Sequence, residues 1–184
     1  SPIIVHGGGK RISNKLSELN IKNNFIKGLR VTDKDTLNIV EDVLVNFNKE
    51  IAKALEEQSL KIKKITSKKN NIITVKPESK ELGFVGTPIH IKIDFLKEII
   101  NANEVPIIAP LGLDESSQIF NINADTVAGS IAKALKARRF IIISDVEGVL
   151  DNDKKLIPEI NSVKAKSLID QKIISGGMIP KINN

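Results

Sequence analysis

Short apolar runs alternate along the chain with stretches whose apolar residues recur every three or four positions. The strand-sized apolar runs are 3–5, 61–65, 72–75, 105–111 and 140–143. The stretches with helical spacing are 10–19, 32–55, 94–101, 124–135 and 162–169. Strands that alternate with amphipathic helices in this way predict an α/β fold with a largely parallel central sheet, a three-layer αβα sandwich.

The segments between these elements carry turn and capping signals. Residues 25–31 predict an extended loop or hairpin around Gly28, residues 112–120 a polar hairpin, and residues 81–86 and 89–93 further strand or loop. The long helix after residue 31 begins with Thr32 and Asp35 in a capping-box-like arrangement. Asn123 and Ser162 are the expected caps of two later helices.

Composition narrows the class of protein. At 184 residues, 41% of them hydrophobic, the chain can bury one good core but is short for two full domains. None of the apolar runs approaches the roughly 20 residues of a membrane helix, and the chain opens on a strand-like run without a signal-peptide pattern. Cysteine is absent, which fits a cytoplasmic protein. The net charge is +6, but the chain has no Trp or Tyr to stack on bases, so we expect no nucleic-acid partner.

Gly7, Gly8 and Gly9 separate the first strand from the first helix. A glycine turn in this context lets the backbone approach an anion and directs free N–H groups and the helix dipole at it. Lys10 follows the turn, but the spacing is not that of a phosphate-binding P-loop. A tight turn that binds no ligand is the alternative.

Polar side chains in two later segments suit recognition of a small anion. Arg30 lies in an apolar segment just before a capped helix, where its planar guanidinium can pair with a carboxylate, although a lone Arg is more often a solvated surface residue. Asn121, Asn123 and Asp125 occupy alternate positions and therefore point to one side of an extended chain. Ordinary helix capping by Asn123 is the alternative, and the two roles are compatible.

Two further segments are candidates for nucleotide contacts. Residues 144–149 follow the predicted buried strand at 140–143, and ligands bind at the carboxyl ends of strands in open α/β sheets. Residues 175–181 combine a glycine pair with Lys181. His6 and His90 have no metal-ligand spacing, so we interpret both as structural and expect no protein metal site.

Taken in order, these segments resemble the N-acetylglutamate kinases of the amino-acid-kinase family. The similarity covers nearly the whole chain and is carried by residues 5–9, 28–32, 82–86, 121–129, 144–150 and 175–181. Each segment alone is moderately specific, whereas the ordered set is highly specific. Gly-Leu-Arg-Val-Thr at 28–32 separates it from other amino-acid kinases.

The resemblance implies a role for each candidate residue. Gly8 and Gly9 would donate backbone N–H groups to the substrate and the transferring phosphoryl group, Arg30 would pair with the α-carboxylate of N-acetylglutamate, and Asn121 and Asn123 would bind its acetamido and carboxylate end. Asp125 would position catalytic lysines, and Lys181 would neutralise phosphoryl charge. The nucleotide pocket would contain Asp145, Val146, Glu147, Gly148, Val149, Leu150, Ile173, Ile174, Ser175 and Lys181, and Mg²⁺ would bridge the ATP phosphates.

The same resemblance implies how the chain is organised. Residues 1–139 would form the lobe that binds the acyl amino acid, residues 140–184 would begin the nucleotide-binding lobe, and the helix at about 33–57 would form a homodimer contact. Family members carry a second catalytic lysine upstream of Ser1 and extend beyond Lys181. We therefore expect a truncated product or partial sequence with little kinase activity. The turn at 67–71 also lacks the family's glycines, and residues 46–48 look shortened.

Two competing functions remain open from the sequence. One is another amino-acid kinase, acting on aspartate, glutamate, carbamate or a nucleotide. Arg30 and the paired Asn121 and Asn123 argue against it. The other is a non-catalytic module that binds N-acetylglutamate without ATP.

Overall fold

A parallel three-stranded sheet lies at the centre of the computed structural model, which describes residues 1–183. Its strands are β1 (Ile4–Val5), β7 (Val105–Ile108) and β4 (Ile62–Ile65), in the order β1-β7-β4. Ile107 of β7 pairs with Ile4 on one side and Lys64 on the other. All four β7 residues are buried, as expected for a central parallel strand covered on both faces.

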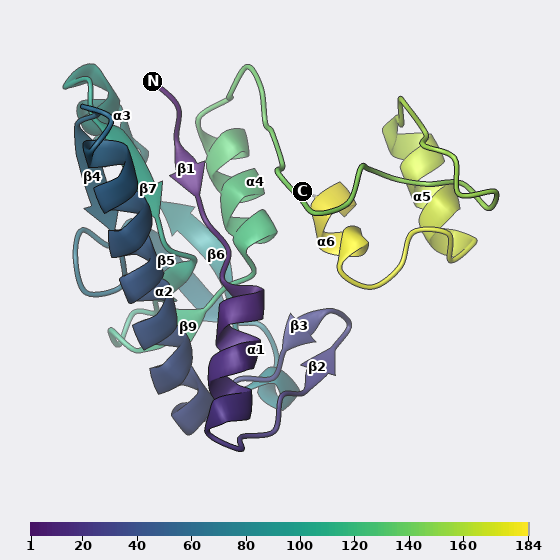
Figure 1. Cartoon of the computed structure of the whole chain (residues 1–184), viewed down its shortest axis with the longest axis horizontal. Coiled ribbons are helices and arrows are strands. Elements are labelled where there is room, and N and C mark those ends of the chain that lie inside the picture. Colours follow the sequence, from purple (N-terminus) through teal and green to yellow (C-terminus); the bar gives the residue numbers. More distant parts are fainter. Residues whose placement is uncertain (184) are drawn as a thin grey trace.

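Helices cover this sheet on both faces and give the predicted three layers (Figure 1). On one face, α1 (Gly9–Glu18) and α2 (Lys34–Glu56) pack side by side, and Leu16 and Leu44 belong to their shared apolar cluster. On the other, α3 (Ile93–Asn101) and α4 (Ala124–Ala134) contribute Leu96 and Val127 to a second, larger cluster.

A second, mixed sheet of four strands extends the larger cluster. It has the order β6-β5-β8-β9, with β5 (Ile73–Pro77), β6 (Gly86–Ile91), β8 (Leu111–Leu113) and β9 (Ile119–Asn121). The β8–β9 pair confirms the predicted polar hairpin. The run at 105–111 predicted one strand, but it forms two, β7 and β8. Pro110 between them has no N–H to continue a ladder.

The helix predictions are confirmed, but two of the three predicted caps are wrong by one residue. Asp33, not Thr32, caps α2 by accepting the Thr36 N–H at 2.8 Å. Asn161, not Ser162, caps α5 (Ser162–Asp170). The observed cap is one position later than predicted in α2 and one position earlier in α5, and in each case this neighbour also has a short polar acceptor side chain. Asn123 caps α4 as predicted.

The segment at 25–31 is the expected hairpin. β2 (Phe25–Ile26) pairs with β3 (Leu29–Arg30), and the two residues between them, Lys27 and Gly28, have φ of 50° and 81°. Two consecutive positive φ values are typical of the tight turns that match the twist of a hairpin. Further along, 81–86 contributes the short 3-10 helix η1 (Lys80–Leu82) and the start of β6.

The buried strand predicted at 140–143 is wrong. Residues 140–143 have no strand structure, and Ile141 and Ile143 are 74% and 94% exposed. A strand needs a neighbour for its backbone hydrogen bonds, and within residues 1–183 no strand pairs with this segment.

The chain beyond residue 144 has a small apolar cluster of its own, with Val149, Leu168 and Ile174 at its centre. This part of the chain includes the predicted helix α5 and a second helix, α6 (Met178–Asn183). The sequence did not predict α6. The division of the chain at 139/140 stays a prediction. Among residues 1–183, no helix is both long and apolar enough to cross a membrane.

Candidate functional site

The Gly7–Gly9 turn lies at the carboxyl end of β1, between the first turns of two helices. Gly8 is the N-cap of α1, and a Cβ built on it would lie 2.7 Å from Leu44 Cδ2 of α2. A Cβ on Gly7 would lie 3.9 Å from Ala124 Cβ, at the start of α4. The turn therefore brings together the N-termini of α1 and α4, where free N–H groups and helix dipoles favour an anion.

Arg30 is buried next to this turn. Its Nη2 donates to the Gly9 carbonyl and to Ser13 Oγ, both at 3.1 Å, and its Nη1 donates to Asn23 Oδ1. Its guanidinium carbon lies 4.7 Å from the centre of the Phe25 ring. Burial lowers the pKa of Arg30 from its ordinary value. A desolvated guanidinium beside helix N-termini is a strong candidate partner for a substrate carboxylate.

Asn121 and Asn123 reach the same region from β9 and the start of α4. Asn121 Nδ2 donates to Thr32 Oγ1 at 3.2 Å, and Thr32 Oγ1 donates to the Arg30 carbonyl at 2.9 Å. Asn123 Oδ1 accepts the Thr126 N–H at 3.0 Å. The capping alternative for Asn123 is therefore confirmed. Its Nδ2 is not used by that cap, so substrate binding stays possible.

Asp125 and Lys181 form an ion pair although 56 residues separate them in the chain. Lys181 Nζ lies 3.0 and 3.1 Å from the two carboxylate oxygens of Asp125. Both side chains are mostly shielded, at 20% exposure for Asp125 and 25% for Lys181. Asp125 is on the first turn of α4, next to the glycine turn, so the pair holds an ammonium group close to the candidate anion site.

The residues predicted to contact nucleotide lie in two segments that pack together. Val149 and Ile174 share one buried cluster. The flanking predicted residues are exposed or half-buried: Asp145, Val146, Glu147, Gly148, Leu150, Ile173 and Ser175. Gly148 has φ of 153°, and a Cβ on it would lie 2.8 Å from Leu156.

Some contacts at the site were missed from the sequence. Ser13 and Asn23 hold Arg30, and their signal was weak because polar residues in a helix and a loop are ordinary. The tip of the β2–β3 hairpin lies against the glycine pair before α6, since a Cβ on Gly28 would be 3.4 Å from the Gly176 carbonyl oxygen. This contact links the arginine hairpin to the segment that carries Lys181.

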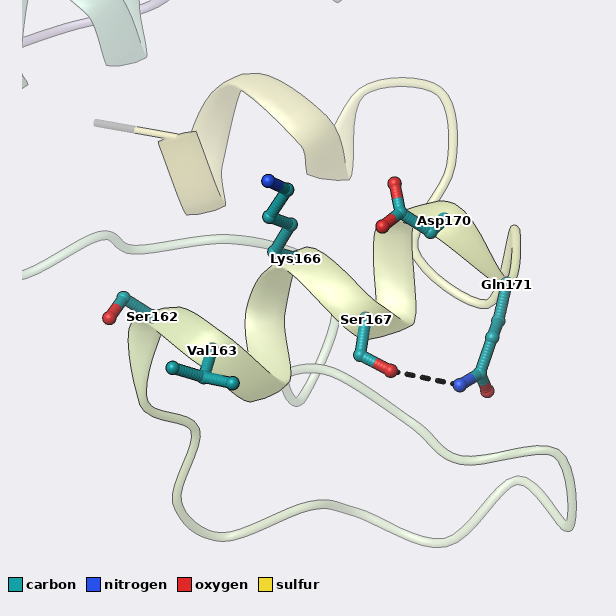
Figure 2. Close-up of a pocket in the computed structure, with 6 residues that line it drawn as sticks. All are labelled: Ser162, Val163, Lys166, Ser167, Asp170 and Gln171. Carbon is teal, nitrogen blue, oxygen red and sulfur yellow. Dashed lines mark hydrogen bonds between the residues drawn. The ribbon is translucent and has the colours of Figure 1, made fainter.

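Two hollows on the surface lie away from these residues. The one in Figure 2 is lined by α5 and by Gln171, which directly follows this helix and donates a hydrogen bond of 2.9 Å to Ser167. It contains no predicted site residue. The other lies between α1 and α2. In the part of the chain that the structure describes, no group of three His, Cys, Asp or Glu side chains could hold a metal ion.

Comparisons with known proteins show the family to which the chain belongs. The chain matches the amino acid kinase family over residues 1–184. An acetylglutamate kinase of Pelagibacter ubique (strain HTCC1062) is 73% identical over 184 residues, which are 100% of this chain and 64% of that protein. An acetylglutamate kinase of Rhodopseudomonas palustris (strain BisB18) is 42% identical over 196 residues, covering 99% of this chain and 66% of that protein. This chain thus spans less than two thirds of the length of the Pelagibacter relative.

Solved structures show the same architecture. The protein smu.665 of Streptococcus mutans UA159 has a TM-score of 0.94 at 33% identity, over 98% of this chain and 74% of that one. An N-acetylglutamate synthase of Neisseria gonorrhoeae has a TM-score of 0.86 at 19% identity, over 98% of this chain and 42% of that one, which shows the fold alone. With the glycine turn, Arg30 and the Asp125–Lys181 pair gathered at one edge of a parallel sheet, and with the family match over its length, the chain belongs to the amino acid kinase family.

Proposed function

We propose that this chain binds N-acetyl-L-glutamate and MgATP and carries out, or contributes to, phosphorylation of the side-chain carboxylate, a step of arginine biosynthesis. The products would be N-acetylglutamyl 5-phosphate and ADP. One observation carries the proposal: Arg30 contacts Gly9 at the turn where α1 begins, and that turn lies against the start of α4, which carries Asp125 and its partner Lys181. The names of the relatives support the choice of substrate.

In this proposal the acyl amino acid lies across the glycine turn. Arg30 pairs with the α-carboxylate through a planar, charge-assisted contact. Asn121 and Asn123 bind the acetamido end through their side-chain amides. The backbone N–H groups of Gly8 and Gly9 bind the side-chain carboxylate and the phosphoryl oxygens, because the α1 dipole favours negative charge there.

Phosphoryl transfer requires placement and charge compensation more than covalent chemistry by the protein. MgATP supplies the phosphoryl group, and Mg²⁺ would bridge its phosphates. A substrate carboxylate oxygen forms a bond to the γ-phosphorus as the bond from that phosphorus to the β–γ bridging oxygen breaks. Lys181 compensates charge on the phosphoryl oxygens, and Asp125 orients Lys181. The backbone at Gly176 and Gly177 is open to the approach of phosphates, since a Cβ built on either would meet no atom within 4 Å.

We also propose a cytoplasmic homodimer with its contact on α2. The hollow between α1 and α2 combines apolar side chains such as Ile39 and Val43 with both signs of charge, as in Arg11 and Asp42. A surface of mixed charge and apolar groups can be complementary to itself across a twofold axis. Light scattering on the purified chain checks this: a mass of twice 20.2 kDa is expected, and a monomer at all concentrations would contradict it.

Calorimetric titration tests the substrate assignment. The chain should bind N-acetylglutamate and, separately, MgATP, and it should bind free glutamate much more weakly. Arg30→Ala should weaken N-acetylglutamate binding by about 1.5–3 kcal/mol, the range for hydrogen bonds to charged groups. Arg11→Ala is the matched control, because the half-exposed Arg11 side chain pairs with Glu50 and has no proposed contact with the substrate.

The outcomes separate the competing functions. Binding of free glutamate but not of N-acetylglutamate would indicate another amino-acid kinase. Binding of N-acetylglutamate but not of MgATP would indicate a non-catalytic module. An Arg30→Ala affinity equal to that of the parent chain would refute the role given to Arg30.

A further inference from the structure

A buried network of hydrogen bonds links α2 and β7 to the glycine turn. Asn48 lies on α2 with no exposed surface, and its Nδ2 donates to the Ile107 carbonyl at 3.0 Å and to His6 Nε2 at 3.1 Å. His6, 6% exposed, follows β1 directly, and its Nδ1 lies 2.8 Å from the Gly7 carbonyl oxygen. Three elements, α2, β7 and the end of β1, therefore meet at one amide group.

The backbone carbonyl of Ile107 determines the donor and the acceptor of each hydrogen bond in this network. A carbonyl can only accept, so the NH₂ group of Asn48 must face it. The second hydrogen of that NH₂ group then points at His6 Nε2, which must be the unprotonated nitrogen of the ring. The proton of neutral His6 is therefore on Nδ1, where it is donated to the Gly7 carbonyl.

Asn48 makes hydrogen bonds through its amide nitrogen but not through its amide oxygen. Asn48 Oδ1 is buried and has no hydrogen-bond partner among the described residues. An unpaired buried acceptor is unfavourable, and an apolar side chain would avoid it. The asparagine donates two hydrogen bonds that an apolar side chain could not make. We infer that these two bonds are the reason for a polar residue at position 48.

The bond from His6 to Gly7 also orients the next backbone group. A peptide unit is planar, and in the trans form its C=O and N–H point in opposite directions. When His6 holds the Gly7 carbonyl oxygen, the Gly8 N–H is directed to the other side of the peptide plane. Gly8 is the N-cap of α1 and the predicted donor to the substrate.

We propose that Asn48 and His6 are positioning residues: Asn48 selects the Nδ1–H tautomer of His6, and His6 fixes the Gly7–Gly8 peptide so that the Gly8 N–H points at the bound anion. This inference rests on the proposed function for the identity of that anion. The orientation of the peptide itself does not depend on it.

The surroundings of His6 favour the neutral ring and pack against it. Burial lowers the pKa of His6 from its ordinary value of 6.5, and the bond to the Gly7 carbonyl opposes this only in part. The Phe47 ring meets the imidazole edge-on, with ring centres 5.3 Å apart. The nearby charges are Arg11, stacked on Phe47 at 4.0 Å, and its partner Glu50. A cationic His6 would also point an N–H at the Asn48 NH₂ group, which repels it.

Nitrogen NMR of the labelled chain tests the tautomer directly. Wild-type His6 should show the neutral Nδ1–H form and be less protonated at pH 6.5 than an ordinary histidine, which is about half protonated there. In Asn48→Asp the new carboxylate accepts from Nε2, so His6 should gain its proton at a higher pH than in the wild-type chain. Asn46→Asp is the matched control, because Asn46 is exposed on the same helix and should leave His6 unchanged.

The Gly8 amide signal and ligand affinity test the consequence. Asn48→Leu should shift the Gly8 amide resonance and weaken N-acetylglutamate binding about 10-fold to 100-fold, the equivalent of one charge-assisted hydrogen bond. An Nε2–H tautomer in the wild-type chain would overturn the proposal even if Asn48→Leu does not fold. So would a folded Asn48→Leu with an unchanged Gly8 signal. If the wild-type chain binds no N-acetylglutamate, the proposed function fails, while the tautomer and the Gly8 signal still decide the positioning role.

Discussion

Replacing Gly83 with alanine should damage the strap that joins the two elements proposed to bind the substrate. This strap is residues 82–85. It bonds to Thr32 on one side, where the Phe84 N–H donates to the Thr32 carbonyl at 2.7 Å. On the other side, the Asn121 N–H donates to the Phe84 carbonyl at 2.9 Å. The strap therefore joins the segment after Arg30 to the strand that carries Asn121.

The structure sets the size of the effect. Gly83 has φ of 67° and ψ of −125°, a conformation that L residues rarely adopt, and a Cβ on it would lie 2.4 Å from the Thr32 carbonyl oxygen. Backbone strain of this kind costs about 1–3 kcal/mol. Overpacking against a fixed backbone atom adds about 1–3 kcal/mol. We expect Gly83→Ala to lower the free energy of unfolding by about 2–6 kcal/mol, a large part of the stability of a typical domain.

Urea unfolding followed by circular dichroism is the suitable assay, since the chain has no Trp or Tyr for fluorescence. Gly177→Ala is the matched control. Gly177 has no positive φ, and a Cβ on it would meet no atom within 4 Å. The free energy of unfolding of Gly177→Ala should therefore stay within about 0.5 kcal/mol of the parent value, the usual range for surface changes. Equal midpoints for Gly83→Ala and the parent chain would refute the account of the strap.

Other predictions concern a helix cap and the ammonium group at the site. The N–H of Thr36 lowers the pKa of Asp33, so the cap stabilises α2 fully above the ordinary carboxyl pKa and is lost as the pH falls through the folded value. Asp33→Ala should cost about 0.5–2 kcal/mol at neutral pH, whereas Asp33→Asn should keep the cap and remove this acid dependence. A parallel acid titration of the parent chain and Asp33→Asn by circular dichroism checks it, and identical acid profiles of these two would contradict it. Lys181→Met should weaken MgATP binding about 10-fold and leave N-acetylglutamate binding within about twofold. Calorimetry measures both affinities, and a loss of affinity confined to N-acetylglutamate would contradict the role given to Lys181.

Hydrophobic spacing was sufficient to predict most of the fold. β1, β4 and β7, and the helices that cover them, follow from apolar periodicity because each buries one face or both. The strand predicted at 140–143 failed for a reason that periodicity cannot reveal. An apolar run becomes a strand only beside another strand, and the sequence of the run does not say whether a neighbour is present.

Some residues of the candidate site could be predicted from the sequence, and others could not. Gly8, Arg30 and Asp125 stood out because each is a distinctive residue in a recognisable local context. Asn48 did not, since a polar residue in the middle of a long helix is ordinarily a solvated one. Its role depends on β1 and β7 packing beside α2, and on the contact of His6 with the same amide. Such long-range contacts leave no local pattern in one sequence.

Mapping N-acetylglutamate binding by NMR on the labelled chain tests whether the glycine turn, Arg30 and Asn123 form one site. We predict saturable shifts of the Gly8 and Gly9 amides, the Arg30 guanidinium and the Asn123 side-chain amide, all with one dissociation constant. Shifts confined to the α5 hollow of Figure 2, or to residues that do not adjoin the glycine turn, would contradict it.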